Sequence, residues 1–151
     1  MIRIIVAGSP VGKGRPKFVR ATGRAYTPEK TANYEAILAA RGADAMAGQP
    51  LLDGPLQVIV TAFMPIATTW SKKKTAAALE GSLRPGRPDA DNMLKVLDAL
   101  NGIVWRDDAQ IAEARISKLY DEEPRLEIEV TQIDTNVMLR RKARAFLELN
   151  L

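Results

Sequence analysis

The stretch Asp-Ala-Asp-Asn-Met-Leu-Lys-Val-Leu-Asp-Ala-Leu-Asn, residues 89–101, carries the most regular pattern in the chain. Its apolar side chains recur at helical spacing, which predicts an amphipathic helix that stops before Gly102. Its polar side chains include Asp89, Asp91 and, four residues after the second aspartate, Lys95. The stretch therefore combines a core-forming face and a group of charged side chains on one short element.

The patterns on both sides of this stretch predict a mixed fold. Alternating apolar residues and runs of β-branched residues predict strands over residues 2–7, 56–63, 111–120 and 125–131. Helical spacing, bounded by Pro or Gly, predicts further helices near residues 28–48, 69–80 and 135–149. Residues 56–63 are apolar on both faces, which indicates a central strand, and the short link between the last two strands is typical of a hairpin.

These elements fit one α+β domain, a mixed sheet of about four strands with about four helices. We expect this domain to span residues 1–133 and residues 134–151 to form a C-terminal amphipathic helical extension. Residues 8–27 are rich in Gly and Pro, so we expect a loop or a short ribbon there. A chain of 151 residues is long enough to bury a core of its own.

The amino-acid composition narrows the possible chemistry. The chain contains no cysteine and no histidine, which excludes a disulfide framework, a thiolate nucleophile, an imidazole base and the usual zinc sites. Catalysis would depend on carboxylates, hydroxyls, Lys, Arg or an oxygen-ligated metal such as Mg²⁺, Mn²⁺ or Ca²⁺. The sequence also has no apolar run of about 18 residues, so we expect a cytoplasmic protein that does not enter a membrane.

Asp89 and Asp91 can share a metal ion only if Asp89 precedes the helix. Two residues apart within a helix, their side chains would point roughly 200° away from each other. The proline before Asp89 and the preference of Asp for N-cap positions favour a helix that starts there, and the pair Asp107-Asp108 could return to the same point. Alternatively, Asp89 is only a cap, Asp91 and Lys95 are only a surface ion pair, and the later aspartates are only turn residues.

Basic side chains gather in two segments that contain few acids. The first segment carries Lys13, Arg15, Lys17, Arg20 and Arg24, and the second carries Lys72, Lys73, Lys74 and Arg87. With 22 Lys and Arg against 18 Asp and Glu, the net charge is only +4, so the distribution matters more than the total. Such segments suit a DNA backbone, or they form a solvated surface.

The glycine-rich residues 8–14 follow a predicted strand but do not match a nucleotide-binding loop. One residue too few separates the glycines, and Gly14 stands where a Ser or Thr would hold Mg²⁺. We therefore expect no nucleotide cofactor.

The ordered set of motifs resembles the RusA family of Holliday junction resolvases, which occurs in phages, prophages and bacteria. The resemblance rests on the strings Arg87–Lys95, Leu97–Gly102 and Asp107–Ile111, and on the opening string Gly8–Phe18 followed by Tyr26-Thr27-Pro28. It covers residues 2–132.

This resemblance implies a homodimeric, Mg²⁺-dependent endonuclease, with Mn²⁺ as a substitute, that acts on four-way junction DNA. Residue by residue, Asp89, Asp91 and Asp108 match the catalytic, metal-binding carboxylates of the family, and Lys95 matches its catalytic lysine. Asp107, which directly precedes Asp108, would contact these ligands and not the metal ion itself.

The sequence departs from the family pattern at Met93, where Leu is usual, at Lys17, where Arg is usual, and in residues 134–151, which extend past the matched region. Two other functions stay open. One is a non-catalytic accessory protein that binds branched DNA, and the other is a less selective metal-dependent nuclease.

Overall fold

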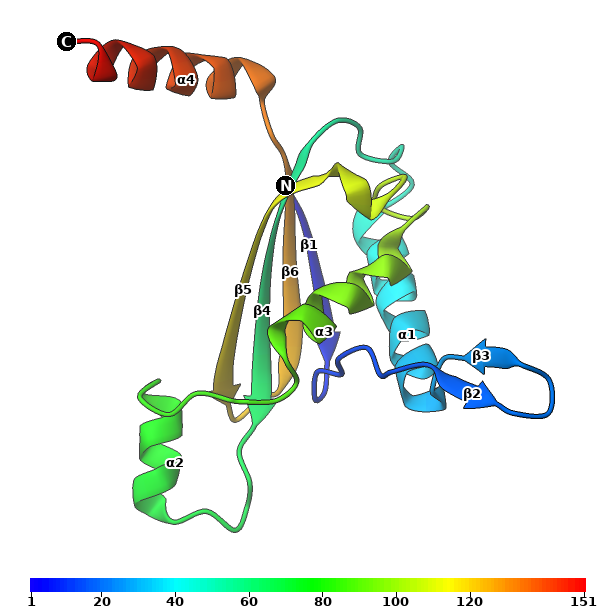
Figure 1. Ribbon diagram of the computed structural model, residues 1–151. Coiled ribbons are helices and arrows are strands. Elements are labelled where there is room, and N and C mark those ends of the chain that lie inside the picture. The colour runs from blue at the N-terminus through cyan, green and yellow to red at the C-terminus, as the bar shows by residue number, and fades with distance from the viewer.

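The computed structural model describes the backbone of residues 1–151 and every side chain except that of Met138. Strands β1 (Ile2–Ala7), β6 (Arg125–Gln132), β4 (Leu56–Pro65) and β5 (Ile111–Asp121) lie side by side, in that order, in one sheet. β6 is antiparallel to both of its neighbours, and β4 and β5 are parallel. Helices α1 (Glu29–Met46) and α3 (Ala90–Lys95) lie against this sheet (Figure 1). The α+β, mixed-sheet prediction is confirmed.

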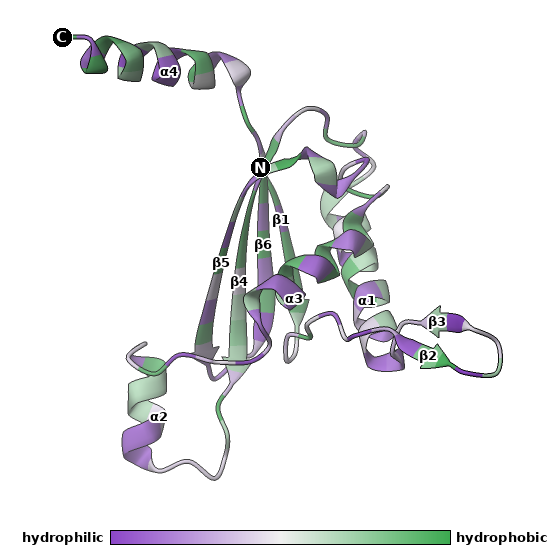
Figure 2. Ribbon diagram, viewed as in Figure 1, coloured by the Kyte–Doolittle hydropathy of each residue, from purple (hydrophilic) through white to green (hydrophobic). Residues whose placement is uncertain are grey.

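Alternation along the strands decides which face of the sheet is buried. In β1, β4 and β6 the even-numbered side chains form the core, among them Ile4, Val58, Val60 and Ile128, none of which is more than 1% exposed. β5 is less buried, and its Ala112 and Ala114 are exposed. The odd-numbered side chains lie on the opposite face and are mostly polar, as the alternating colours of the strands in Figure 2 show. The buried face therefore directs α1 and the segment after α3 to one side of the sheet.

The predicted hairpin between the last two strands is wrong. β4 lies between β5 and β6 and pairs with both. Neighbouring strands are about 4.8 Å apart, so the link at Glu122–Pro124 has to span about 10 Å, which three extended residues can do. The fully buried inner face of β4 favours this central position, as the sequence predicted.

The predicted helix over residues 89–101 is present but is divided. α3 ends at Lys95, and a 3₁₀ helix, η1 (Val96–Leu100), continues the chain. A 3₁₀ helix aligns side chains three residues apart, and Leu97 and Leu100, which are so spaced, are both buried. Trp105 follows, is fully buried, and donates a hydrogen bond of 2.6 Å from its ring nitrogen to Asn101 Oδ1.

Three elements project from this body. The ribbon of β2 (Lys17–Val19) and β3 (Arg24–Tyr26) extends beside the start of α1, and α2 (Lys72–Leu79) lies beyond the end of β4 (Figure 1). α4 (Thr135–Leu149) occupies the predicted C-terminal extension and stands away from the sheet. Asp134 caps α4 by accepting a hydrogen bond of 2.8 Å from the Asn136 amide. Among the described residues, no helix has both the length and the apolar character needed to cross a bilayer.

Replacing Gly42 with Ala tests the packing of η1 on α1. The new Cβ would lie 2.6 Å from Leu100 Cδ2 and 3.5 Å from Ile103 Cγ2. Because Leu100 is fully buried and cannot move aside, the clash should outweigh the helix-propensity gain of about 1 kcal/mol. We expect the free energy of unfolding, measured with urea, to fall by about 1–2 kcal/mol.

The matched control is Gly86→Ala, since a Cβ at Gly86 meets nothing within 4 Å. It should leave the free energy of unfolding unchanged. A Gly42→Ala protein that is more stable than the parent would contradict the packing described here.

Candidate functional site

Three adjoining hollows follow α3 and η1 along the surface. The first, of about 500 Å³, is lined by residues 9–14 and by Arg87, Asp89 and Asn92 among others. The second shares Lys13 and Asn92 with the first. The third shares Lys95 and Asp98 with the second and reaches Asp108. Neighbouring hollows share lining residues and therefore adjoin, and we call this row of three hollows the α3 groove.

Asp89 lies where the metal hypothesis requires it, immediately before the helix. It is the N-cap of α3, with an extended backbone (φ −62°, ψ 147°). Within the described structure, its side chain makes no capping hydrogen bond with the helix. The carboxylate is therefore exposed in the α3 groove, and the alternative in which Asp89 serves only as a cap loses its support.

Asp91 and Lys95 form the ion pair expected from their spacing of four residues. Lys95 Nζ lies 3.3 Å from Asp91 Oδ2, and the side chains are 60% and 66% exposed, respectively. The hydrogen bond from Lys95 lowers the pKa of Asp91, so its carboxylate is charged at neutral pH. An ion pair this exposed contributes little to stability, which leaves both groups available to a ligand.

Asp107 and Asp108 have different roles although they are adjacent. Asp107 caps the short 3₁₀ helix η2 (Asp108–Gln110) and accepts a hydrogen bond of 2.8 Å from the Ala109 amide, which lowers its pKa. Asp108 instead lines the α3 groove. Its pKa is raised, first by its hydrogen bond with Asp107 and then by the nearby Asp98 carboxylate. Asp107 is thus structural, and Asp108 is the member of the pair that faces a ligand.

Asp89 and Asp108 line different hollows of the α3 groove, and Asp91 lines none of the three hollows. Among the described residues, no group of three acidic side chains is arranged to hold one metal ion. The donor set nevertheless fits Mg²⁺, because carboxylate oxygens are the hard ligands that this ion prefers. Asp89, Asp91 and Asp108 are also all exposed. Shared metal binding by this trio stays a prediction.

The predicted DNA-binding residues differ in whether they are exposed to solvent or engaged within the protein. Arg15 and Arg87 are exposed and line the α3 groove. Those on the projecting elements are also exposed: Lys17, Arg20 and Arg24 on the β2–β3 ribbon and Lys72, Lys73 and Lys74 on α2. The Lys74 ammonium lies 4.3 Å from the centre of the Trp70 ring. Lys13 is the exception, because its ammonium contacts Glu35 and Asp98 within the protein.

Sequence reasoning missed two residues that build the groove. Asp98 lies three residues after Lys95, a spacing that places both on one helix face and could have indicated it, and both line the same hollows. Lys118 on β5 donates hydrogen bonds of 2.8 Å and 3.1 Å to the carbonyls of Gly86 and Pro88 and so fixes the chain just before Asp89. A single lysine in a strand gives no such signal, because its partners are remote in the sequence.

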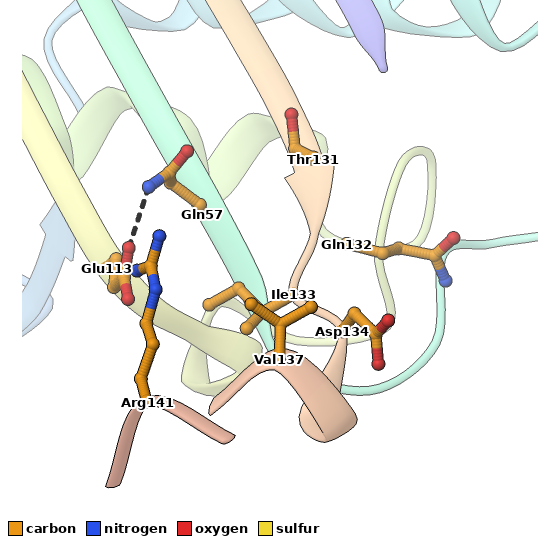
Figure 3. A pocket seen from close by; sticks show the side chains of 8 residues that line it. All are labelled: Gln57, Glu113, Thr131, Gln132, Ile133, Asp134, Val137 and Arg141. Carbon is orange, nitrogen blue, oxygen red and sulfur yellow. Dashed lines mark hydrogen bonds between the residues drawn. The ribbon is translucent and has the colours of Figure 1, made fainter. Parts of the chain in front are cut away.

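A separate hollow lies at the start of α4 (Figure 3). Gln57 Nε2 donates a hydrogen bond of 2.7 Å to Glu113 Oε2 there, and Arg141 of α4 points toward the same carboxylate. The residues that line this hollow include none of the predicted site residues.

Comparison with known proteins defines the class of this protein. Residues 7–131 match the family model of endodeoxyribonuclease RusA, so the class is that of DNA-cleaving enzymes. The chain belongs to the RusA family, as its motifs predicted. It is also 35% identical over 141 residues to the uncharacterized protein YqaN of Bacillus subtilis (strain 168), an alignment that covers 87% of this chain and 96% of that protein. The residues of the α3 groove lie within the matched range, and α4 lies outside it.

Measuring the stability of two variants distinguishes the role of Asp107 from that of Asp108. Asp107→Ala removes the cap of η2, so we expect the free energy of unfolding to fall by about 1 kcal/mol. Asp108→Ala removes a carboxyl group that is crowded by two others, so stability should be unchanged or slightly higher. Urea unfolding of the two variants at pH 7 tests this prediction. A larger loss for Asp108→Ala would contradict it.

Proposed function

We propose that this protein is a Mg²⁺-dependent, structure-specific endodeoxyribonuclease that resolves four-way DNA junctions by paired, symmetric nicks. Membership of the RusA family supports DNA cleavage. The observation that carries the site assignment is that Asp89, Lys95 and Asp108 are exposed and line the α3 groove, and that the exposed Asp91 pairs with Lys95.

In this proposal Asp89, Asp91 and Asp108 hold Mg²⁺. When bound, the ion would lower the pKa of a water molecule and neutralise charge on the scissile phosphate. These three side chains supply oxygen ligands from two segments of the chain, the start of α3 and the start of η2. Their exposure allows both a metal and a phosphate to approach.

Lys95 supplies a fixed positive charge beside these carboxylates. Its ammonium contacts Asp91 at 3.3 Å, and its side chain lines the α3 groove together with Asp108. In this proposal it stabilises the negative charge that builds on the phosphate during attack. Because a lysine ammonium is a compact point charge on a flexible stem, it can move from Asp91 toward a bound phosphate.

The substrate geometry follows from symmetry and charge. We propose that two copies of the chain assemble with two-fold symmetry, so that each copy presents one groove to one of two opposed strands of the junction. Arg15, Arg87 and the basic side chains of the β2–β3 ribbon and α2 would then contact the DNA backbone on both sides of each groove.

One assay separates this proposal from its alternatives. Purified protein is incubated with a labelled four-way junction and with linear duplex of the same sequence, with and without Mg²⁺. Paired nicks in the junction alone, and only with Mg²⁺, support the proposal. Equal cutting of the duplex indicates a less selective nuclease, and binding without any cutting indicates an accessory protein.

Asp91→Asn tests the acidic site directly. The substitution keeps the size of the side chain but removes its charge, so we expect the rate of junction cleavage to fall by about 100-fold or more. Junction affinity in EDTA, measured by gel shift, should persist. The matched control is Asp44→Asn, since Asp44 is an exposed aspartate of α1 that pairs with Arg41. Near-normal cleavage by Asp91→Asn would remove Asp91 from the site.

The proposed DNA contacts of the β2–β3 ribbon predict how junction affinity depends on salt concentration. Each phosphate contact that is lost reduces the slope of log affinity against log salt concentration by about 1. We expect the double variant Arg20→Gln and Arg24→Gln to reduce that slope by about 2, measured by fluorescence anisotropy on a junction in EDTA. Arg41→Gln on α1 serves as the control. An unchanged slope in the double variant would show that Arg20 and Arg24 do not contact DNA.

A further inference from the structure

Lys13 differs from the other basic residues of the N-terminal segment in its contacts. Its Nζ lies 3.1 Å from Asp98 Oδ2 and 3.3 Å from Glu35 Oε1. Glu35 belongs to α1 and Asp98 to η1, so one ammonium joins two elements that are remote in the sequence. The Glu35 oxygen is shielded from water, and a buried carboxylate oxygen is costly unless a positive charge compensates it.

The backbone around Lys13 is clamped between the same two parts of the structure. The Lys13 amide donates a hydrogen bond of 2.9 Å to the Asn92 carbonyl of α3. The Gly14 amide donates one of 3.0 Å to Thr31 Oγ1 of α1, a residue that is 2% exposed. Gly12 approaches the start of α3 so closely that a Cβ there would lie 2.8 Å from Pro88 Cβ. The loop therefore lies wedged between α1 and the segment that carries the catalytic candidates.

We propose that Lys13 is a positioning residue, which ties Asp98 to Glu35 and thereby fixes the segment from Asp89 to Lys95 relative to Asp108. This inference rests on the proposed nuclease function. It gives Lys13 a task inside the protein in place of the phosphate contact that its charge alone predicted.

The surroundings of Lys13 favour this role over a DNA contact. To reach a phosphate, the ammonium would have to leave two carboxylates, and the oxygen of Glu35 that it contacts is shielded from solvent. Burial alone would lower the pKa of Lys13, but the hydrogen bond to Asp98 and the charge of Glu35 outweigh burial and raise it. Arg15, two residues further along, is exposed in the same groove and can contact DNA without such a loss.

The first test measures the mobility of the segment from Asp89 to Asp98 and does not depend on nuclease activity. Lys13→Met keeps most of the side-chain length and removes the charge. In amide hydrogen exchange of the full chain, we expect residues 88–98 to exchange about tenfold faster in this variant. The control is Arg41→Met, which breaks another α1 ion pair, the 3.7 Å contact with Asp44, whose residues line none of the three hollows. Unchanged exchange over residues 88–98 in Lys13→Met overturns the proposal.

The second test separates rate from affinity. We expect Lys13→Met to lower the single-turnover cleavage rate at saturating protein by about 10-fold to 100-fold, with the junction Kd in EDTA and its salt dependence unchanged. Lys13→Arg, which keeps the charge, should retain more activity than Lys13→Met. This second variant keeps the test decisive if Lys13→Met does not fold. A raised Kd and a reduced salt slope, with an unchanged rate, would make Lys13 a phosphate contact and overturn the proposal.

A double-mutant cycle with Asp98 completes the design. If Lys13 acts through Asp98, Lys13→Met should slow cleavage far less in an Asp98→Asn protein than in the parent. Independent, additive effects would overturn the proposal. If the parent protein does not cut junctions at all, the proposed function fails, and the hydrogen-exchange result still decides whether Lys13 positions the segment.

Discussion

The packing of one continuous segment against the sheet and α1 determines the rest of this structure. Met93, Val96, Leu100 and Trp105 are all fully buried, and they belong to the same stretch that carries the charged residues of the site. Full burial of such side chains contributes about 1.5–3 kcal/mol each, which far exceeds the free energy of a surface ion pair. The apolar side chains therefore fix the orientation of α3 and η1, and the polar side chains between them have to face the solvent.

This arrangement concentrates negative charge, and lysines compensate it at different points. Asp107 and, to a smaller degree, Asp98 lie close enough to Asp108 to raise its pKa. Lys95 pairs with Asp91 on the outer surface, and Lys13 pairs with Asp98 on the inner side of the groove. Asp89 and Asp108 line different hollows of the α3 groove. Since like charges repel unless cations hold them, the proposed function requires a divalent cation to draw these carboxylates together.

The parts of the fold and site that the sequence predicted are those with local causes. Alternation in the strands, helical spacing in residues 89–101 and the position of Asp89 before its helix are properties of neighbouring residues. The insertion of β4 between β5 and β6 was missed because pairing between remote strands leaves no local pattern. Lys118 was missed for the same reason. Its partners are backbone carbonyls of a remote loop, and every residue has a backbone carbonyl whatever its side chain.

The charge count of the sequence illustrates the same limit. A net charge of +4 suggests modest attraction to DNA, and it treats every lysine alike. In the structure, the ammonium groups of Lys13 and Lys118 are engaged by acceptors of the protein itself. The arginines of the β2–β3 ribbon are instead exposed on an element that projects from the body. Electrostatic attraction depends on the charges that face solvent, so the ribbon is expected to contribute more to DNA binding than its share of the basic residues indicates.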